Sequence, residues 1–151
     1  SILRGRYHMK IIKRLISSAV AACLLTGATA SVADIAIIVN PESGLSSADA
    51  KQVASVFLGK RGSISGVSLI PIDQEEGQAS RDEFYSKVVN KNASQLNAFW
   101  SRLIFTGKGM PPDQVSADAE VVEVVADDPE MIGYVSPGAV DDSVRVILVV
   151  Q

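Results

Sequence analysis

Gly77-Gln78-Ala79-Ser80-Arg81-Asp82-Glu83-Phe84 is a run of small and polar residues that follows an apolar segment and precedes a helix-period pattern. The run predicts a turn that begins a helix. Such a turn directs unpaired backbone N–H groups, the positive end of the helix dipole and the Arg81 guanidinium toward one point, which suits an oxyanion. A second interpretation needs no ligand, because Ser80 and Glu83 have the spacing of a capping box. The run alone leaves both interpretations open.

Residues 1–33 are predicted to be a leader and a secretory signal peptide, with the start at Met9 and cleavage near Ala33. Three basic residues precede an apolar run from Leu15 to Leu25, and small residues lead to Ser31-Val32-Ala33, which resembles a signal-peptidase site. The apolar run is too short for a stable membrane-spanning helix. We therefore expect a periplasmic or otherwise extracytoplasmic protein.

An alternative for the same leader starts from Val20-Ala21-Ala22-Cys23, which resembles a lipoprotein box. Cleavage there would leave a lipidated Cys23 as a membrane anchor. The apolar run continues past the cysteine, which favours the soluble form. Apart from the leader or this anchor, we expect no contact with a membrane.

Residues 34–151 have the size of one domain with a single core. Five of the 14 Lys and Arg residues lie in the leader, so nine remain against all 17 Asp and Glu residues, a net charge of about −8. This charge makes nucleic acid an improbable partner. The only Cys and the only His also belong to the leader. A zinc site built on Cys or His and a Ser-His-Asp triad are therefore excluded from residues 34–151.

Apolar runs and helix-period segments alternate along residues 34–151, which predicts an α/β domain with a mostly parallel or mixed sheet flanked by helices. In such domains ligands gather at the carboxyl ends of strands, where the run around Ser80 lies. The predicted strands are 34–39, 67–72, 131–135 and 144–150, and the predicted helices begin near 47, 81, 94 and 116.

Thr106–Pro112 contains two glycines and two prolines and is predicted to be a loop. Lys108 lies between the glycines, so this loop is either one wall of a ligand site or a solvated connector. Trp100, in the preceding helix, is expected in the core rather than against a ligand.

Three stretches together resemble the phosphate-type substrate-binding proteins of ABC transporters, which have the type II periplasmic-binding-protein fold. The stretches are Val56–Lys60, Gly77–Phe84 and Met131–Val135, in that order and at similar spacing. The family's central motif reads Gly-Ser-Gly-Thr-Arg, and its hydroxyls, backbone N–H groups and Arg hold phosphate. Gln78, Ala79, Ser80 and Arg81 occupy the last four positions of that motif in this chain. The resemblance therefore implies that these four residues bind the ligand. Lys108, in the loop between two glycines, is a further candidate from the sequence itself.

A full member of the family has two lobes that close on the anion, whereas residues 34–151 resemble the short, single-lobe relatives. The resemblance implies an extracytoplasmic binding protein for phosphate or a similar oxyanion, with an ABC permease or another envelope protein as a partner. A homodimer that supplies the missing lobe is an open alternative. A second hypothesis is a single-lobe interaction or sensor module that has lost small-ligand transport.

Enzyme activity is the weakest interpretation of the sequence. Five acidic residues lie near the central run, but no nucleophile with an activating base and no complete metal motif accompanies them. We expect no catalytic residue, no bound metal and no cofactor.

Overall fold

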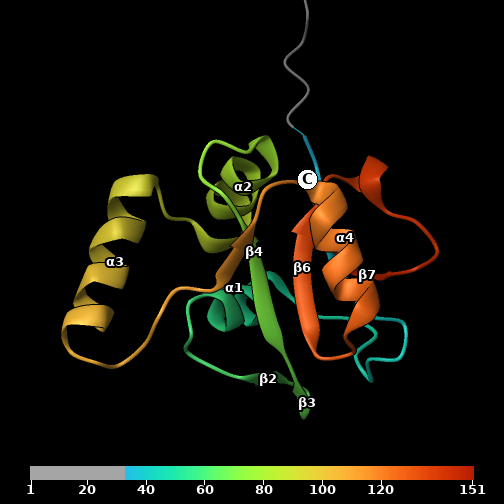
Figure 1. Ribbon diagram of the computed structural model, residues 1–151, viewed down its shortest axis with the longest axis horizontal. Coiled ribbons are helices and arrows are strands. Elements are labelled where there is room, and N and C mark those ends of the chain that lie inside the picture. The colour runs from blue at the N-terminus through green and yellow to red at the C-terminus, as the bar shows by residue number, and fades with distance from the viewer. Residues whose placement is uncertain (1–32) are drawn as a thin grey trace, which may run out of the picture. The chain divides into compact units, whose positions relative to one another are not determined.

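Five strands form one mixed sheet in the computed structural model, which describes residues 33–151 (Figure 1). β4 is parallel to its neighbours β5 and β6, whereas β1 is antiparallel to β6 and β7. The predicted α/β class is confirmed, and the sheet takes the mixed form. In spatial order the strands are β5 (Asp113–Val115), β4 (Ile70–Gln74), β6 (Met131–Val135), β1 (Ile35–Val39) and β7 (Arg145–Val150).

Residues 1–32 of the predicted leader, Cys23 among them, lie outside the described residues, and Ala33 at the predicted cleavage site is the first residue described. The described residues form one compact unit that contains both of the hydrophobic clusters described below. Within residues 33–151, no helix has the length and apolar character needed to cross a bilayer.

β1 confirms the strand predicted at residues 34–39, and all five of its residues are buried. Ile35, Ile37 and Val39 pack into one hydrophobic cluster, whereas Ala36 and Ile38 pack into the other, so the strand is covered on both faces. A run of this kind is typical of parallel strands. Here both neighbours are antiparallel, and the run is apolar because helices cover both faces of the sheet.

Helices on one side of the sheet build the larger hydrophobic cluster. Phe57 and Phe84 are fully buried there, and Trp100 is a core residue as expected. The predicted helix 81–89 is an α-helix that continues as one π-helical segment. The elements are α1 (Ala50–Phe57), α2 (Ala79–Phe84), the π-helix η2 (Tyr85–Val89) and α3 (Ala93–Phe105).

On the other side of the sheet, α4 (Asp118–Asp127) packs Val121, Val122 and Val125 into the second cluster. Gly133 of β6 allows this close approach, because a Cβ at that position would lie 2.4 Å from a methyl carbon of Val121. The strand motif Met131–Val135 therefore needs its glycine for helix packing.

Side-chain caps fix the starts of α1 and α3, which were predicted near 47 and 94. Asp49 and Gln52 form a capping box at α1, and Asn92 and Gln95 form another at α3. The helices begin at Ala50 and Ala93 as a result.

The predicted strand 67–72 is two strands. Val67–Ser68 (β3) pairs with Ser63–Ile64 (β2) across a two-residue turn, in which both residues have positive φ. β4 begins after this hairpin and extends to Gln74, immediately before the central run. The short polar edge strand β5 was not predicted, since three residues give too little periodicity to detect.

Candidate functional site

The start of α2 lies at the carboxyl end of β4, as predicted, but its cap is not the capping box. Gln78 is the N-cap residue and no side chain caps the helix, while Ser80 is already the second helical residue. A turn at Gly77, with φ of +97°, leads into the helix, and the N–H of Gln78 donates to the carbonyl of Glu75 at 3.3 Å. The interpretation of Ser80 and Glu83 as a capping box is therefore wrong.

Three consecutive backbone N–H groups at this helix start are free of hydrogen bonds to any residue that the structure describes. They belong to Ala79, Ser80 and Arg81, whereas the next N–H, of Asp82, donates to the carbonyl of Gln78. Unpaired N–H groups and the helix dipole favour a negatively charged group at such a position.

Ser136, which was not predicted as a site residue, adds a second hydroxyl beside this helix start. Its Oγ lies 3.0 Å from Oγ of Ser80, although Ser136 follows β6. β4 and β6 are parallel neighbours, so their carboxyl ends lie at the same edge of the sheet. The signal that could have identified Ser136 was a hydroxyl residue immediately after a strand that ends beside β4.

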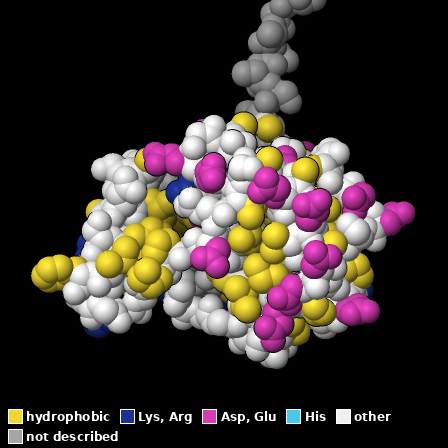
Figure 2. Space-filling view, in the orientation of Figure 1, with side chains coloured by type: hydrophobic (Ala, Val, Ile, Leu, Met, Phe, Trp, Pro, Cys, Tyr) yellow, Lys and Arg dark blue, Asp and Glu magenta, His cyan; other side chains and the backbone are white. Residues whose placement is uncertain are grey.

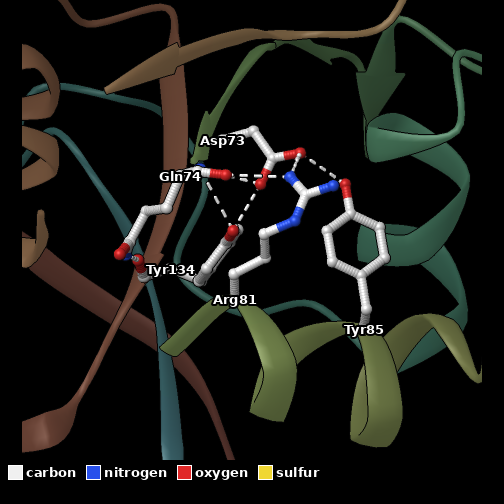
Figure 3. Close-up of polar contacts among 5 residues, drawn as sticks. All are labelled: Asp73, Gln74, Arg81, Tyr85 and Tyr134. Carbon is white, nitrogen blue, oxygen red and sulfur yellow. Dashed lines mark hydrogen bonds and ion pairs between the residues drawn. The ribbon is translucent and has the colours of Figure 1, made fainter. Parts of the chain in front are cut away.

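Arg81 points back toward the end of β4, where its guanidinium is held by two acceptors (Figure 3). Nη1 donates to Oδ2 of Asp73 at 3.0 Å and to the carbonyl of Gln74 at 2.8 Å. The guanidinium also lies over the ring of Tyr85, 4.8 Å from its centroid. Nη2 and Nε donate to no residue within 33–151, so they are the part of the fork that a ligand could still engage.

Asp73 is the buried partner of Arg81, and its side chain is only 3% exposed. The hydroxyl of Tyr85 donates to Oδ2 at 2.5 Å, the hydroxyl of Tyr134 donates to Oδ1, and the backbone N–H of Gln74 also donates to Oδ1 (Figure 3). Burial, reinforced by the charge of Asp73, raises the pKa of both tyrosines well above the ordinary value. Both hydroxyls therefore remain protonated donors, and Asp73 offsets the charge of Arg81.

Asp118, at the start of α4, brings a second carboxylate close to the two serines. Its Oδ1 accepts from Nε2 of Gln74 at 2.8 Å, and its Oδ2 accepts from the N–H of Ser136 at 3.3 Å. These bonds fix Ser136 relative to β4. They also place negative charge near the helix start, which weakens the attraction for an anion.

Arg81 also lines a cavity of about 300 Å³ between α2, η2 and the start of α3. Of the five predicted ligand residues, only Arg81 lines it. Gln78, Ala79 and Ser80 stay together at the helix start outside its lining. The lining residues are Glu76, Arg81, Asp82, Tyr85, Ser86, Lys91, Asn92, Ala93, Leu96 and Asn97.

Lys108 is not brought to this cavity or to the start of α2. It is exposed and follows the opposite end of α3 from the residues that line the cavity. Gly107, with φ of +68°, ends the helix, and the N–H of Lys108 donates to the carbonyl of Leu103. This geometry is a Schellman motif, so the loop Thr106–Pro112 is ordered by the helix end that it closes.

The acidic residues near the central run do not form a metal site. Asp73 is paired with Arg81, and Glu83 is paired with Lys87 at 3.0 Å. Within residues 33–151, no three His, Cys, Asp or Glu side chains are grouped so that they could hold a metal ion.

Comparison with solved structures identifies the fold. The chain is similar to a protein from Clostridium perfringens described as a phosphate ABC transporter substrate-binding protein with bound phosphate, at a TM-score of 0.60 and 20% identity. It is also similar to an ABC-type phosphate transport receptor from Vibrio cholerae, with a TM-score of 0.61 and 18% identity. A third similar structure is PstS from Borrelia burgdorferi, with a TM-score of 0.58 and 15% identity. No family model and no curated protein matches the sequence.

These matches cover 76–77% of this chain but only 45–47% of each neighbour. The chain thus spans less than half the length of the neighbours, which agrees with the single lobe predicted from the sequence. At these identities the likeness establishes the fold, a lobe of the kind found in phosphate-binding proteins.

Proposed function

We propose that this chain is a non-enzymatic binding protein for phosphate or a similar small oxyanion, and that the anion binds at the start of α2. The observation that carries the proposal is the three free N–H groups of Ala79, Ser80 and Arg81 beside the hydroxyls of Ser80 and Ser136. Several N–H and O–H donors gathered at one helix start suit a tetrahedral oxyanion. The fold likeness to proteins described as phosphate-binding supports this reading.

Arg81 has a defined part in this proposal. Asp73 and the carbonyl of Gln74 occupy Nη1, which leaves Nη2 and Nε to approach the ligand. Because Asp73 offsets the guanidinium charge, Arg81 attracts an anion less strongly than an unpaired arginine would. We expect weaker and more salt-sensitive binding than two lobes closing on an anion would give, because one lobe leaves part of the ligand in water.

Isothermal titration of residues 34–151 with phosphate, with sulfate and with a neutral solute tests the proposal. Saturable heat with an oxyanion and none with the neutral solute is the expected result. Arg81→Lys keeps the charge but loses the planar fork, so its affinity should fall between that of the wild type and that of Arg81→Ala. Lys108→Ala is the matched control, since this exposed cation lies outside the site. Silence toward every oxyanion would refute the proposed function.

The interaction or sensor module is the second candidate, and two carboxylates favour it. Asp73 offsets Arg81, and Asp118 adds negative charge beside Ser136. An ABC permease or another envelope protein would then be the partner that the lobe recognises.

Light scattering with and without phosphate tests the related proposal that two copies complete one site.

We further propose that the protein acts outside the cytoplasm after removal of residues 1–33. The basic, apolar and small-residue order of this leader supports export. Intact-mass measurement of the exported protein should give an N-terminus near Asp34. A species that retains Cys23 with added lipid mass would show an anchored protein instead.

A further inference from the structure

The outer end of α3 exposes large apolar side chains that the fold does not use. We define the α3 tip as residues 102–110, the last turn of the helix and the loop that closes it. Phe105 is 93% exposed, Met110 is 74% exposed and Ile104 is 49% exposed. The opposite face of the same helix is packed, since Leu96 and Trp100 are buried in the core. Figure 2 shows the hydrophobic side chains that gather over this part of the molecule.

Charge is distributed unevenly around the α3 tip. No Asp or Glu occurs between Glu83 and Asp113, while that interval contains four basic residues. Two of them, Arg102 and Lys108, belong to the tip, and both are exposed. Acidic side chains instead gather over α4 and the loops beside it (Figure 2). The tip is therefore apolar and basic on a protein that is otherwise acidic.

A second copy of the chain is a poor occupant for this surface. A two-fold contact through the tip would place Arg102 and Lys108 of one copy against the same residues of the other. A head-to-tail contact with an acidic face would match the charges but would not close into a defined dimer. A surface that is both negatively charged and able to take up apolar side chains fits better.

We propose that the α3 tip docks onto an anionic lipid bilayer. Phe105, Ile104 and Met110 enter the boundary between head groups and acyl chains, and Arg102 and Lys108 lie at the lipid phosphates. The Schellman motif at Gly107 supports this role, because it holds the loop against the helix end and presents both groups of side chains together. The acidic residues on α4 oppose binding only weakly once they lie beyond a Debye length of about 8 Å.

The expected strength is that of a reversible peripheral contact. Complete burial of the Phe105 side chain in the bilayer should strengthen binding by roughly 10- to 100-fold. Each cation that lies near the anionic surface should strengthen binding by about fivefold. Removal of either contribution should therefore be measurable.

Co-sedimentation of residues 34–151 with vesicles tests the proposal without the apolar leader. We expect binding to vesicles of equal parts phosphatidylglycerol and phosphatidylcholine, and much less to phosphatidylcholine alone. Phe105→Ser should weaken binding at least tenfold, whereas the matched change Val149→Ser, at a half-exposed position on β7, should not. The emission of Trp100, the only tryptophan, reports whether each variant keeps its core.

The basic residues are tested separately, which keeps the proposal open to refutation if Phe105→Ser does not fold. Replacing both Arg102 and Lys108 by Gln should reduce binding about 25-fold, while Lys51→Gln on α1 should leave it unchanged. Absence of vesicle binding at low salt would overturn the proposal. So would a lipid-free dimer that Phe105→Ser dissociates, because the tip would then be covered by a second copy. Phosphate titration is independent of these outcomes, since the tip contains no residue of the proposed oxyanion site.

Discussion

Replacement of Arg81 by alanine should destabilise the domain strongly, although Arg81 lies in the first turn of a helix where the dipole disfavours a cation. In the folded protein Arg81 is the counter-charge of Asp73, whose side chain is 3% exposed, and only 14% of the Arg81 side chain is exposed. The substitution leaves a buried carboxylate without its cation. A contribution from the helix dipole alone would instead predict no change or a small gain in stability.

The expected loss follows from what remains around Asp73. Removing one partner of a buried ion pair lowers the free energy of unfolding by about 3–5 kcal/mol. Two tyrosine hydroxyls and the N–H of Gln74 still donate to Asp73, which places the loss near the lower end, at about 3 kcal/mol. For a domain of this size the melting temperature should fall by roughly 10 °C.

Urea unfolding followed by the emission of Trp100 measures this loss. Arg61→Ala is the matched control, because Arg61 is exposed and forms no ion pair with any described residue, so its change should stay within about 0.5 kcal/mol. Adding Asp73→Asn to Arg81→Ala removes the unpaired charge and should restore part of the stability. An Arg81→Ala protein as stable as the wild type would refute the buried pair as the reason for the position of Arg81.

Three further predictions concern other parts of the domain. Because folding raises the pKa of Tyr85 and Tyr134, both hydroxyls contribute their full stabilisation below about pH 10. Above that pH the free energy of unfolding should fall by roughly 2.7 kcal/mol per pH unit, since each tyrosine contributes about half of this slope. Urea unfolding in alkaline buffers measures the slope. Replacement of both by Phe should flatten that slope. Gly133→Ala should lower the free energy of unfolding by about 1–3 kcal/mol, because the new methyl group overlaps a valine of α4. Ser136→Ala should weaken oxyanion binding about two- to tenfold, as measured by calorimetry, whereas Lys108→Ala should leave the affinity unchanged. Equal effects of the two substitutions would contradict the proposed site.

Periodicity was sufficient to predict the elements that carry the core. The strands β1 and β6 follow from apolar patterns that span five or more residues. β5 could not be found in this way, since three mostly polar residues form a strand only because β4 offers them a parallel edge. Similarly, the ends of α1 and α3 depend on side-chain caps that have no counterpart in the apolar pattern.

The candidate site was predicted in location but not in its contacts. The run 77–84 does lie between a strand end and a helix start. However, the pairing of Arg81 with Asp73, eight residues earlier, depends on how the intervening turn folds, and the approach of Ser136 depends on which strand lies beside β4. Lys108 was chosen because it lies between two glycines of a loop. That local pattern does not show that the loop follows the end of α3 that lies away from the candidate site.

The position of β1 has a consequence for how the protein acquires its structure during synthesis. This early strand lies between β6 and β7, so that Val39 pairs with Ile132 and Ile35 pairs with Val150. The ribosome needs on the order of ten seconds to translate the intervening residues, and until then β1 has neither of its neighbours. Contacts between such distant segments also form slowly. Much of the sheet therefore cannot assemble while the chain is being made, which leaves an extended interval in which a translocase that accepts only unfolded polypeptide could take it.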